Sequence, residues 1–328
     1  MRPVFIGGCE RSGTTLLGAM LGGHPDYVCV PEMQFKFDLL RLSPNGAGEK
    51  MDKASSLRTL NQRSSFRIWD LSIDLTSLTH EAVLYQELID WVVMLYGQKV
   101  AKPTPTVWID HTPKNTRYAA TLFHAFPEAR MIHIVRDGRA VAASVLPLDW
   151  GPNEIEPAAH FWAERLAYGL MAESRWPDKV VRIHYEDLVQ APESTLQQLC
   201  IAIDIEYHPA MSQAAGFQVP QYTAQQHALI GHAPDRSRVS GWETQLTPRQ
   251  VEIFEHTTAD LLAMLGYTLK FGVHAKKVSR RESLVSSIRE LYKKEFANRQ
   301  RKRKRRKETV PTGSATGSAT GSAGVPPA

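Results

Sequence analysis

Cysteine is scarce in this sequence, which has three among 328 residues. Cys9, Cys29 and Cys200 are too few to predict a disulfide framework, so a reducing compartment fits best and we expect a cytoplasmic protein. The cysteines and the histidines also lack the spacing of zinc ligands. We therefore expect no metal site.

Long apolar runs are absent as well. No stretch approaches the roughly 18 apolar residues that a membrane-spanning helix needs, so we expect no transmembrane segment. The chain runs from Met1 directly into strand-like sequence, which leads us to expect no signal peptide. The composition that is present, with 43% hydrophobic and 22% charged residues, is ordinary for a globular protein whose core can hold a ligand.

Most of the positive charge lies in one short segment. Residues 299–307 read Arg-Gln-Arg-Lys-Arg-Lys-Arg-Arg-Lys, and without their eight cations the net charge falls from +5 to −3. The segment follows a charged, helical arm (276–298) and precedes a Gly/Ser/Ala/Thr-rich repeat that we expect to be disordered, so 299–328 is assigned to a tail. Because basic runs bind phosphates without specificity, a nucleic-acid-binding or membrane-surface protein is the rival interpretation of this segment. Because no aromatic residues are interleaved, we expect no specific nucleic-acid partner and an accessory role for the tail.

The rest of the sequence alternates strands with helices. We predict strands at 4–8, 107–110, 130–135 and 180–183, helices at 14–22, 80–96, 118–126, 138–145, 157–176, 192–203 and 247–265, and a loop over the polar stretch 43–65. This alternation favours an α/β fold with a central parallel sheet covered on both faces. Such sheets bind ligands at the carboxyl ends of their strands, so a site is expected in the turns after residues 8 and 135.

The turn after residue 8 has the composition of a phosphate-binding loop. Gly8-Cys9-Glu10-Arg11-Ser12-Gly13-Thr14-Thr15 carries two glycines at the G-x-x-x-x-G spacing between a strand and a helix. Backbone N–H groups at a helix N-terminus bind phosphate oxygens, and Gly13 allows a close approach. The hydroxyls of Ser12, Thr14 and Thr15 add donors, and Arg11 adds a fixed positive charge. Thr14 stands where a nucleotide triphosphatase carries lysine, which argues against that class.

With His24-Pro25 downstream, this loop resembles the 5′-phosphosulfate loop of sulfotransferases that use 3′-phosphoadenosine 5′-phosphosulfate (PAPS). The resemblance is closest to protein-tyrosine sulfotransferases and their bacterial relatives. The segment His133–Ser144 (HIVRDGRAVAAS) is similar to the family's 3′-phosphate segment, which implies that Arg136 and Ser144 hold the ribose 3′-phosphate. The resemblance covers roughly residues 3–270. It implies a P-loop-like three-layer α/β/α domain over 1–275, with PAPS as co-substrate and no metal.

Two further segments resemble the family more weakly. The segment 182–188 (RIHYEDL) is similar to a strand-end segment that brings Tyr185 near the nucleotide, although a turn that caps the next helix is the alternative. The segment 238–242 (RVSGW) resembles the loop that closes over the nucleotide, which implies contacts from Arg238 and Ser240. Trp242 is equally well explained as a core residue.

The resemblance also implies a catalytic set of Arg11, Glu32 and His111. Arg11 would stabilise the moving group and the leaving phosphate. Glu32 falls where protein-tyrosine sulfotransferases carry the base, and a surface glutamate is the equal alternative. His111 stands where relatives usually carry lysine, and it would supply a positive charge or act as a base. Alternatively, Lys114 enters the site and His111 only ends a strand.

The sequence thus predicts an enzyme that moves a sulfuryl group from PAPS to an acceptor hydroxyl, in line and without metal. The acceptor stays open among a peptide tyrosine, a carbohydrate and a small molecule. A P-loop kinase or nucleotide triphosphatase-like protein is the alternative, followed by a non-catalytic nucleotide-binding relative. A homodimer is compatible with the sequence.

Overall fold

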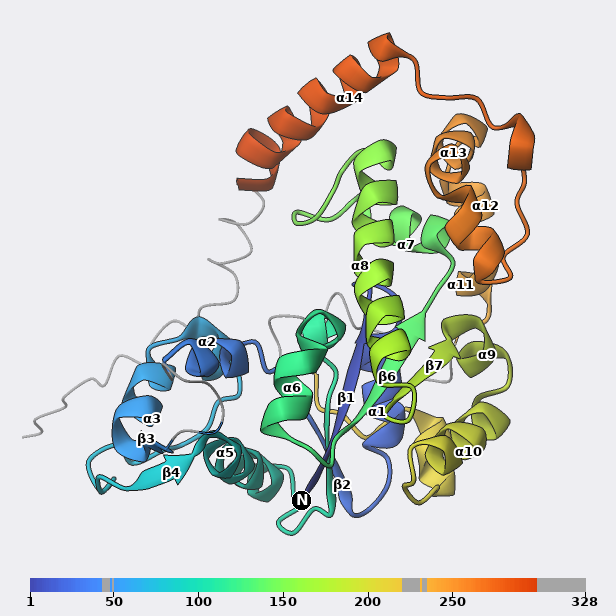
Figure 1. Cartoon of the computed structure of the whole chain (residues 1–328). Helices are drawn as coiled ribbons and strands as arrows, with labels where there is room; N and C mark the ends of the chain where they lie inside the picture. The colour runs from blue at the N-terminus through green and yellow to red at the C-terminus, as the bar shows by residue number, and fades with distance from the viewer. Residues whose placement is uncertain (43–47, 49, 220–230, 232–234, 300–328) are drawn as a thin grey trace, which may run out of the picture.

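A five-stranded parallel sheet forms the centre of the protein (Figure 1). The structure, a computed structural model, describes residues 1–42, 48, 50–219, 231 and 235–299. The strand order is β2-β5-β1-β6-β7, and every neighbouring pair is parallel. The strands are β1 (Arg2–Gly8), β2 (Tyr27–Val30), β5 (Val107–Asp110), β6 (Arg130–Val135) and β7 (Val180–His184).

Helices cover both faces of this sheet because side chains alternate along its strands. Val4 and Ile6 of β1 belong to one buried cluster, whereas Phe5 between them belongs to another. The first face is covered by α1 (Thr14–Leu21), α9 (Tyr185–Gln190) and α10 (Pro192–Ala202). The second is covered by α5 (Tyr85–Lys99), α6 (Ala119–Ala125) and α8 (Ile155–Arg175). The predicted three-layer α/β/α fold is confirmed.

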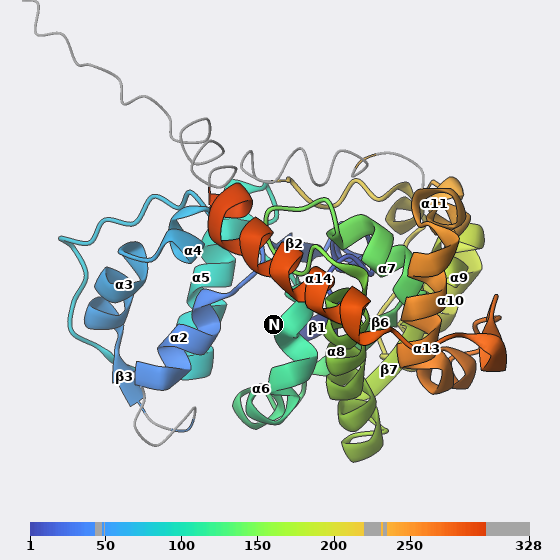
Figure 2. The same cartoon turned by 90° about the horizontal axis from the view of Figure 1, so that it is seen from above.

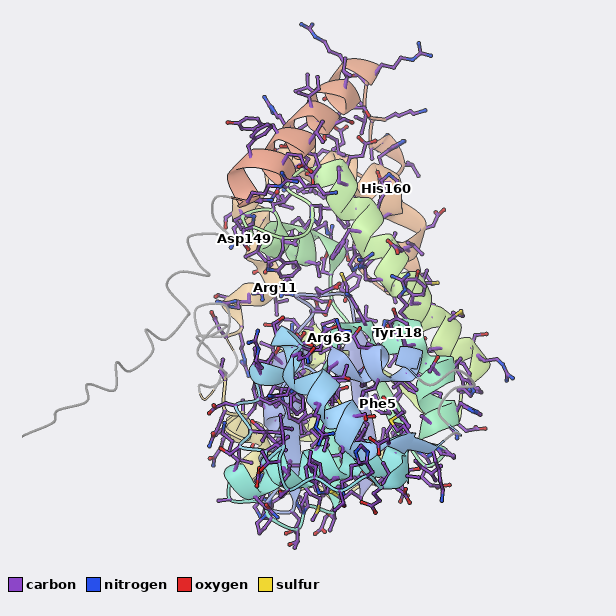
Figure 3. All side chains as sticks on the ribbon, turned by 90° about the vertical axis from the view of Figure 1, so that its left-hand side faces the viewer. Phe5, Arg11, Arg63, Tyr118, Asp149 and His160 are labelled. Atoms are coloured by element: carbon purple, nitrogen blue, oxygen red, sulfur yellow. The ribbon has the colours of Figure 1, made fainter. Side chains whose placement is uncertain are left out.

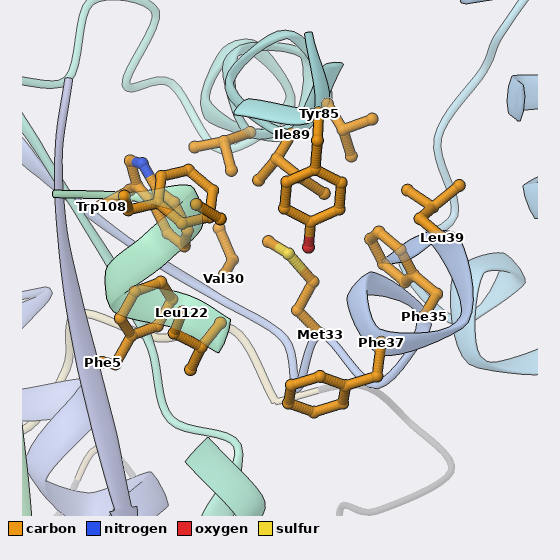
Figure 4. Close-up of a cluster of buried hydrophobic side chains, with 14 of the residues drawn as sticks. Phe5, Val30, Met33, Phe35, Phe37, Leu39, Tyr85, Ile89, Trp108 and Leu122 are labelled. Atoms are coloured by element: carbon orange, nitrogen blue, oxygen red, sulfur yellow. The ribbon is translucent and has the colours of Figure 1, made fainter. Parts of the chain in front are cut away.

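The cluster on the second face is rich in aromatic residues, as Figure 4 shows. Phe5 meets Trp108 edge to face with ring centroids 5.4 Å apart, and both rings also contact Phe126. Met33 and Phe35 extend the cluster into α2 (Phe35–Leu42). Packing of this kind fixes the segment between β2 and α2, and this segment contains Glu32.

A third buried cluster surrounds the turn after β6. It joins α7 (Gly138–Val145) to α8 and α13 (Pro248–Met264), with α11 (Ser237–Ser240) and α12 (Trp242–Gln245) beside them. A Cβ on Gly138 would lie 2.6 Å from both Trp162 and Phe254, so glycine is required there. The indole N–H of Trp162 donates to the Arg136 carbonyl at 3.2 Å. The core thereby holds the turn that carries Arg136.

The region between β2 and β5 differs from the sequence-based expectation. The stretch 43–65, expected as a loop, contains a strand and a helix, and the helix predicted from His80 begins only at Tyr85. Glu87 accepts a hydrogen bond from the Leu84 N–H at 2.7 Å and so fixes that start. The elements not predicted are β2, α2, β3 (Lys50–Asp52), α3 (Lys53–Asn61), α4 (Ser64–Arg67), β4 (Ala82–Leu84), α9, α11, α12 and the 3₁₀ turns Pro113–Tyr118, Pro209–Gln213 and Gly272–His274.

The predicted charged arm is helical. It contains α14 (Arg280–Tyr292), which continues into a π-helical turn (Lys293–Ala297). The basic run from residue 300 onward and the repeat after it lie outside the described residues, as does most of the Gln-rich stretch after residue 219. In the part of the chain that the structure describes, no helix is long and apolar enough to cross a bilayer.

Candidate functional site

The loop between β1 and α1 has the backbone of an anion-binding turn. Arg11 and Gly13 both have left-handed backbone angles, with φ of 72° and 98°. The Ser12 N–H donates to the Cys9 carbonyl at 3.1 Å and closes the turn. Gly13 caps α1 without a side-chain hydrogen bond, and the first turn of the helix has no acidic residue. The N–H groups that begin α1 are therefore available to an anionic group.

Both glycines of the loop are required by close packing. A Cβ on Gly8 would lie 2.3 Å from the Ile134 carbonyl oxygen of the neighbouring strand. A Cβ on Gly13 would lie 2.5 Å from Cδ2 of Tyr185. The G-x-x-x-x-G spacing thus serves two contacts, one with β6 and one with the first residue of α9.

Three arginines from distant parts of the chain meet beside this loop. The Nε–H of Arg11 donates to the Ser144 hydroxyl at 3.0 Å. Arg136 donates through Nη1 to the Arg11 carbonyl at 2.9 Å and through Nη2 to the Arg238 carbonyl at 2.8 Å. Its guanidinium lies 4.2 Å from the centre of the Tyr185 ring. We call Arg11, Arg136 and Arg238 the arginine cluster.

The positive charges of the arginine cluster disfavour one another. Burial, and then the charges of Arg136 and Arg238, lower the pKa of Arg11. Burial likewise lowers the pKa of Arg136. Among the described residues, the buried Ser12 hydroxyl and Arg136 Nε have no hydrogen-bond partner. Buried donors without partners beside like charges are the arrangement that a multivalent anion such as a nucleotide phosphate stabilises.

A network behind the arginine cluster holds the β6–α7 turn. Glu186 accepts from the Asp137 N–H at 3.0 Å and from the Tyr267 hydroxyl at 3.0 Å. Arg139 pairs with Asp137 at 2.7 Å and with Glu255 at 2.6 Å, and all three are buried. Sequence analysis considered Glu186 only as part of a turn that caps the next helix. No local pattern indicated that Glu255 or Tyr267 would join this network.

Glu32 lies at the junction of β2 and α2, partly shielded from solvent. Gln34 Nε2 donates to its Oε2 at 3.0 Å. Burial raises the pKa of Glu32, which moves it toward the range of a general base. Its backbone neighbour Met33 is fixed because the Met33 N–H donates to the Thr112 hydroxyl at 2.9 Å. The glutamate thus comes from a segment tied to the carboxyl end of β5.

A buried ion pair stands next to Glu32. Lys36 Nζ lies 2.5 Å from Oδ2 of Asp110, and both side chains are fully buried. Burial alone would raise the pKa of Asp110, but the Lys36 charge and the hydrogen bonds from Lys36 and Thr112 outweigh it and lower that pKa. The pair joins α2 to the end of β5. Sequence analysis missed it, because nothing in the sequence signals that a lysine after an apolar residue is buried.

The structure brings His111 into the core beneath α1. Its ring is buried, with Nδ1 3.5 Å from the Cys29 sulfur and the ring centroid 4.8 Å from that of Phe217. Lys114, the alternative donor of positive charge, is exposed and lines a small pocket with Glu10 and Arg165. A catalytic role for His111 stays a prediction.

The remaining predicted residues differ in their surroundings. Thr14 and Thr15 are buried in the first turn of α1. Arg238 is half exposed, and its Nε lies 3.7 Å from Asp235. Ser240 is exposed at the end of α11. Trp242 is buried under the Arg139 guanidinium at 4.1 Å, which favours the core interpretation.

In Figure 3, Arg11 lies between Asp149 and His160 on one side and Phe5 on the other. Among the described residues, no group of three or more His, Cys, Asp or Glu is placed to hold a metal ion. The expectation that no metal is needed stays a prediction.

Together, the parallel sheet, the phosphate loop and the arginine cluster define a P-loop-like, nucleotide-binding α/β protein. The sulfotransferase family model matches residues 3–209, and the chain belongs to this family. It is accordingly an enzyme that transfers a sulfuryl group.

Individual relatives and structures agree with this assignment. Protein-tyrosine sulfotransferase 1 of Danio rerio is 23% identical over 279 residues, which cover 80% of this chain and 72% of the relative. Nodulation protein NoeE of Sinorhizobium fredii is 26% identical over 327 residues, covering 88% of this chain and 72% of the relative. The solved sulfotransferase domain from the Synechococcus PCC 7002 olefin synthase has a TM-score of 0.57 at 21% identity and covers 82% of this chain and 96% of that domain, which supports the fold.

Proposed function

We propose that this sulfotransferase takes its sulfuryl group from PAPS and binds both phosphate ends of that donor at the arginine cluster. The loop 8–15 would hold the 5′-phosphosulfate through the N–H groups of α1 and the Ser12 hydroxyl. Arg136 and Ser144 would hold the 3′-phosphate. The observation that supports this proposal most is the hydrogen bond of 3.0 Å from Arg11 to Ser144, because it joins the two motifs in one site.

Tyr185 and Arg238 would complete the donor site. The Tyr185 ring lies against Arg136 and Gly13, which supports a role beside the nucleotide next to the loop. Arg238 would add a third positive charge from the segment after residue 234, with Ser240 beside it in α11. A binding site with three arginines suits a ligand that carries charge at both ends.

The bound donor would supply the sulfuryl group, and this chain's residues would prepare the acceptor. Glu32 would accept the proton of the acceptor hydroxyl, whose oxygen then forms the new bond to sulfur. The bond between sulfur and the 5′-phosphate oxygen breaks, and its electron pair stays on the phosphate. Arg11 would neutralise this developing charge. His111 or Lys114 would assist from the end of β5 as a positive charge.

The acceptor would carry a hydroxyl group, and a peptide tyrosine is the first to test. Relatives such as the one from Danio rerio are named protein-tyrosine sulfotransferases, which supports that choice. Carbohydrates and small molecules are the next acceptors to screen. The kinase alternative loses its support because Thr14 occupies the lysine position and the chain belongs to the sulfotransferase family.

Calorimetric titration with 3′-phosphoadenosine 5′-phosphate, without Mg²⁺, tests the donor site. We expect micromolar binding in the intact protein and its loss in Arg11→Ala and in Arg136→Ala. Arg175→Ala is the matched control. Arg175 is exposed at the end of α8, so its replacement removes the same charge at a distant site. Binding of ATP with Mg²⁺ in place of the 3′-phosphate nucleotide would overturn the proposal.

A further inference from the structure

Helix α14 places its polar face against the protein and its apolar face toward solvent, which is the reverse of most surface helices. A surface helix normally buries its apolar face and exposes its polar face. Here polar residues face the protein: Glu282 pairs with Arg249 at 2.9 Å, and Glu290 accepts from the Asn153 N–H at 2.8 Å. Lys293, in the turn that follows, pairs with Glu154 at 2.9 Å. These contacts repeat along one side of the helix and leave the other side to solvent.

The solvent side of α14 is apolar. Leu284, Ile288 and Leu291 are 62%, 60% and 62% exposed, at spacings of four and three residues that place them in one row. Val285, Tyr292 and Phe296 are also exposed and widen the row, and the last two rings stack with centroids 5.6 Å apart. We call these six residues the apolar face of the arm. Figure 1 shows α14 at the outer edge of the protein, beyond α8, and Figure 2, seen from above, shows it lying in front of the sheet.

Cations border this apolar face. Arg280, Arg281, Arg289 and Lys294 are all exposed. The two carboxylates of α14 that face the protein are engaged there, and Glu295 pairs with Arg299 at 2.6 Å. The sequence then continues directly into the basic run 299–307, with eight cations. An apolar row, aromatic rings and flanking Lys and Arg are the features of helices that lie in the interface of an anionic membrane.

We propose that the arm docks on a bilayer rich in anionic phospholipid, with the apolar face at the level of the acyl chains and the basic run against the headgroups. The back of the helix stays on the protein through Glu282, Glu290 and Lys293. The enzyme would then act as a peripheral membrane protein, held by two signals that are each weak alone.

Charge and polarity favour this occupant over a second copy of the chain. A second copy brings the same eight cations and the same net charge of +5, so the two copies repel each other. A nucleic acid would attract the cations but would leave the apolar face uncovered. An anionic bilayer satisfies both features at once.

Sedimentation of the full chain with phospholipid vesicles tests the proposal. We expect binding to vesicles of phosphatidylcholine and phosphatidylglycerol that exceeds binding to pure phosphatidylcholine by about tenfold, and that weakens as salt is added. Leu284→Ser, Ile288→Ser and Leu291→Ser, combined in one variant, should lower binding to the anionic vesicles by about tenfold or more.

The matched control removes three exposed apolar side chains from other sites, through Met171→Ser, Ile201→Ser and Val273→Ser. It should sediment like the parent protein. A second variant, in which residues 301–304 become glutamine, should lose binding to the anionic vesicles. Affinity for 3′-phosphoadenosine 5′-phosphate should be unchanged in all three variants, because none touches the arginine cluster.

Two results would overturn the proposal. One is full vesicle binding by the triple serine variant, since the apolar face would then play no part. The other is a protein that ignores the vesicles and sediments as a dimer, with the same serine substitutions making it a monomer. That outcome would assign the apolar face to a second copy of the chain.

Discussion

Arg11 and Ser144 are joined by a hydrogen bond of 3.0 Å although they lie 133 residues apart. The first belongs to the loop before α1 and the second to the last turn of α7. Because β1 and β6 are neighbours and both end at this edge of the sheet, the two elements that follow them meet. Through this contact, the phosphate loop and the segment that contains Ser144 form one donor site.

Replacement of Ser144 tests whether this position recognises the 3′-phosphate. Ser144→Ala should weaken binding of 3′-phosphoadenosine 5′-phosphate by about tenfold, the scale of one hydrogen bond to a charged group. It should leave the weaker binding of adenosine 5′-phosphate unchanged, because that nucleotide lacks the 3′-phosphate. Calorimetry with both nucleotides gives the ratio. An equal loss for both would contradict the assignment.

Glu32→Gln should lower the transfer rate without lowering the stability of the protein. The variant should lose about 10²–10⁴-fold in transfer rate if Glu32 is the base. Because burial raises the pKa of Glu32 in the folded protein, its ionised form opposes folding above the unfolded-state pKa. The glutamine variant should therefore be at least as stable as the parent at neutral pH. Melting curves and transfer assays on the same samples check both expectations.

The pH profile gives an independent test of Glu32. Its raised pKa means that the carboxylate becomes protonated at a higher pH than an ordinary glutamate does. The rate of the parent enzyme should fall as pH drops through this raised value, and the small residual rate of Glu32→Gln should not show this fall. A profile that is the same in both proteins would remove Glu32 from the mechanism.

The buried pair of Lys36 and Asp110 should be needed for folding as a unit. Lys36→Met leaves a buried carboxylate without its cation and should cost about 3–5 kcal/mol of stability. Adding Asp110→Asn removes the charge but keeps an oxygen for the Thr112 hydrogen bonds, so most of the loss should be recovered. Chemical denaturation measures both variants. If the double variant is less stable than the single one, the two residues do not act as a pair.

Gly13→Ala should damage the site through Tyr185. The new Cβ would lie 2.5 Å from that ring, at a backbone angle that costs roughly 1–2 kcal/mol for a residue other than glycine. Gly266→Ala has comparable backbone strain, with φ of 82°, but its Cβ would meet nothing within 4 Å. Both variants should melt lower than the parent, and only Gly13→Ala should lose affinity for 3′-phosphoadenosine 5′-phosphate.

Local sequence patterns predicted the central part of the fold well. The boundaries of β6 (Arg130–Val135) and α7 (Gly138–Val145) agree with the prediction, because an apolar run and a strong turn define them. Strand β2 was missed, although at four residues it is as long as β5, which was predicted. Helix α3 was missed because its polar sequence, KASSLRTLN, is typical of a loop. It is stabilised by packing of Leu57 and Leu60 against the core and by the Asp52 side chain, which caps its N-terminus.

Local sequence was sufficient to predict the phosphate loop, the order of the two motifs and the alternation of strands and helices. Each of these depends on residues that are close along the chain, where spacing and turn chemistry are sufficient. The folded structure alone shows that Arg11, Arg136 and Arg238 meet, that Lys36 is buried against Asp110, and that α14 exposes its apolar side. The contacts of Arg11 with Arg136 and of Lys36 with Asp110 join residues far apart in sequence, and the parallel sheet helps to form them by bringing the carboxyl ends of its strands to one edge.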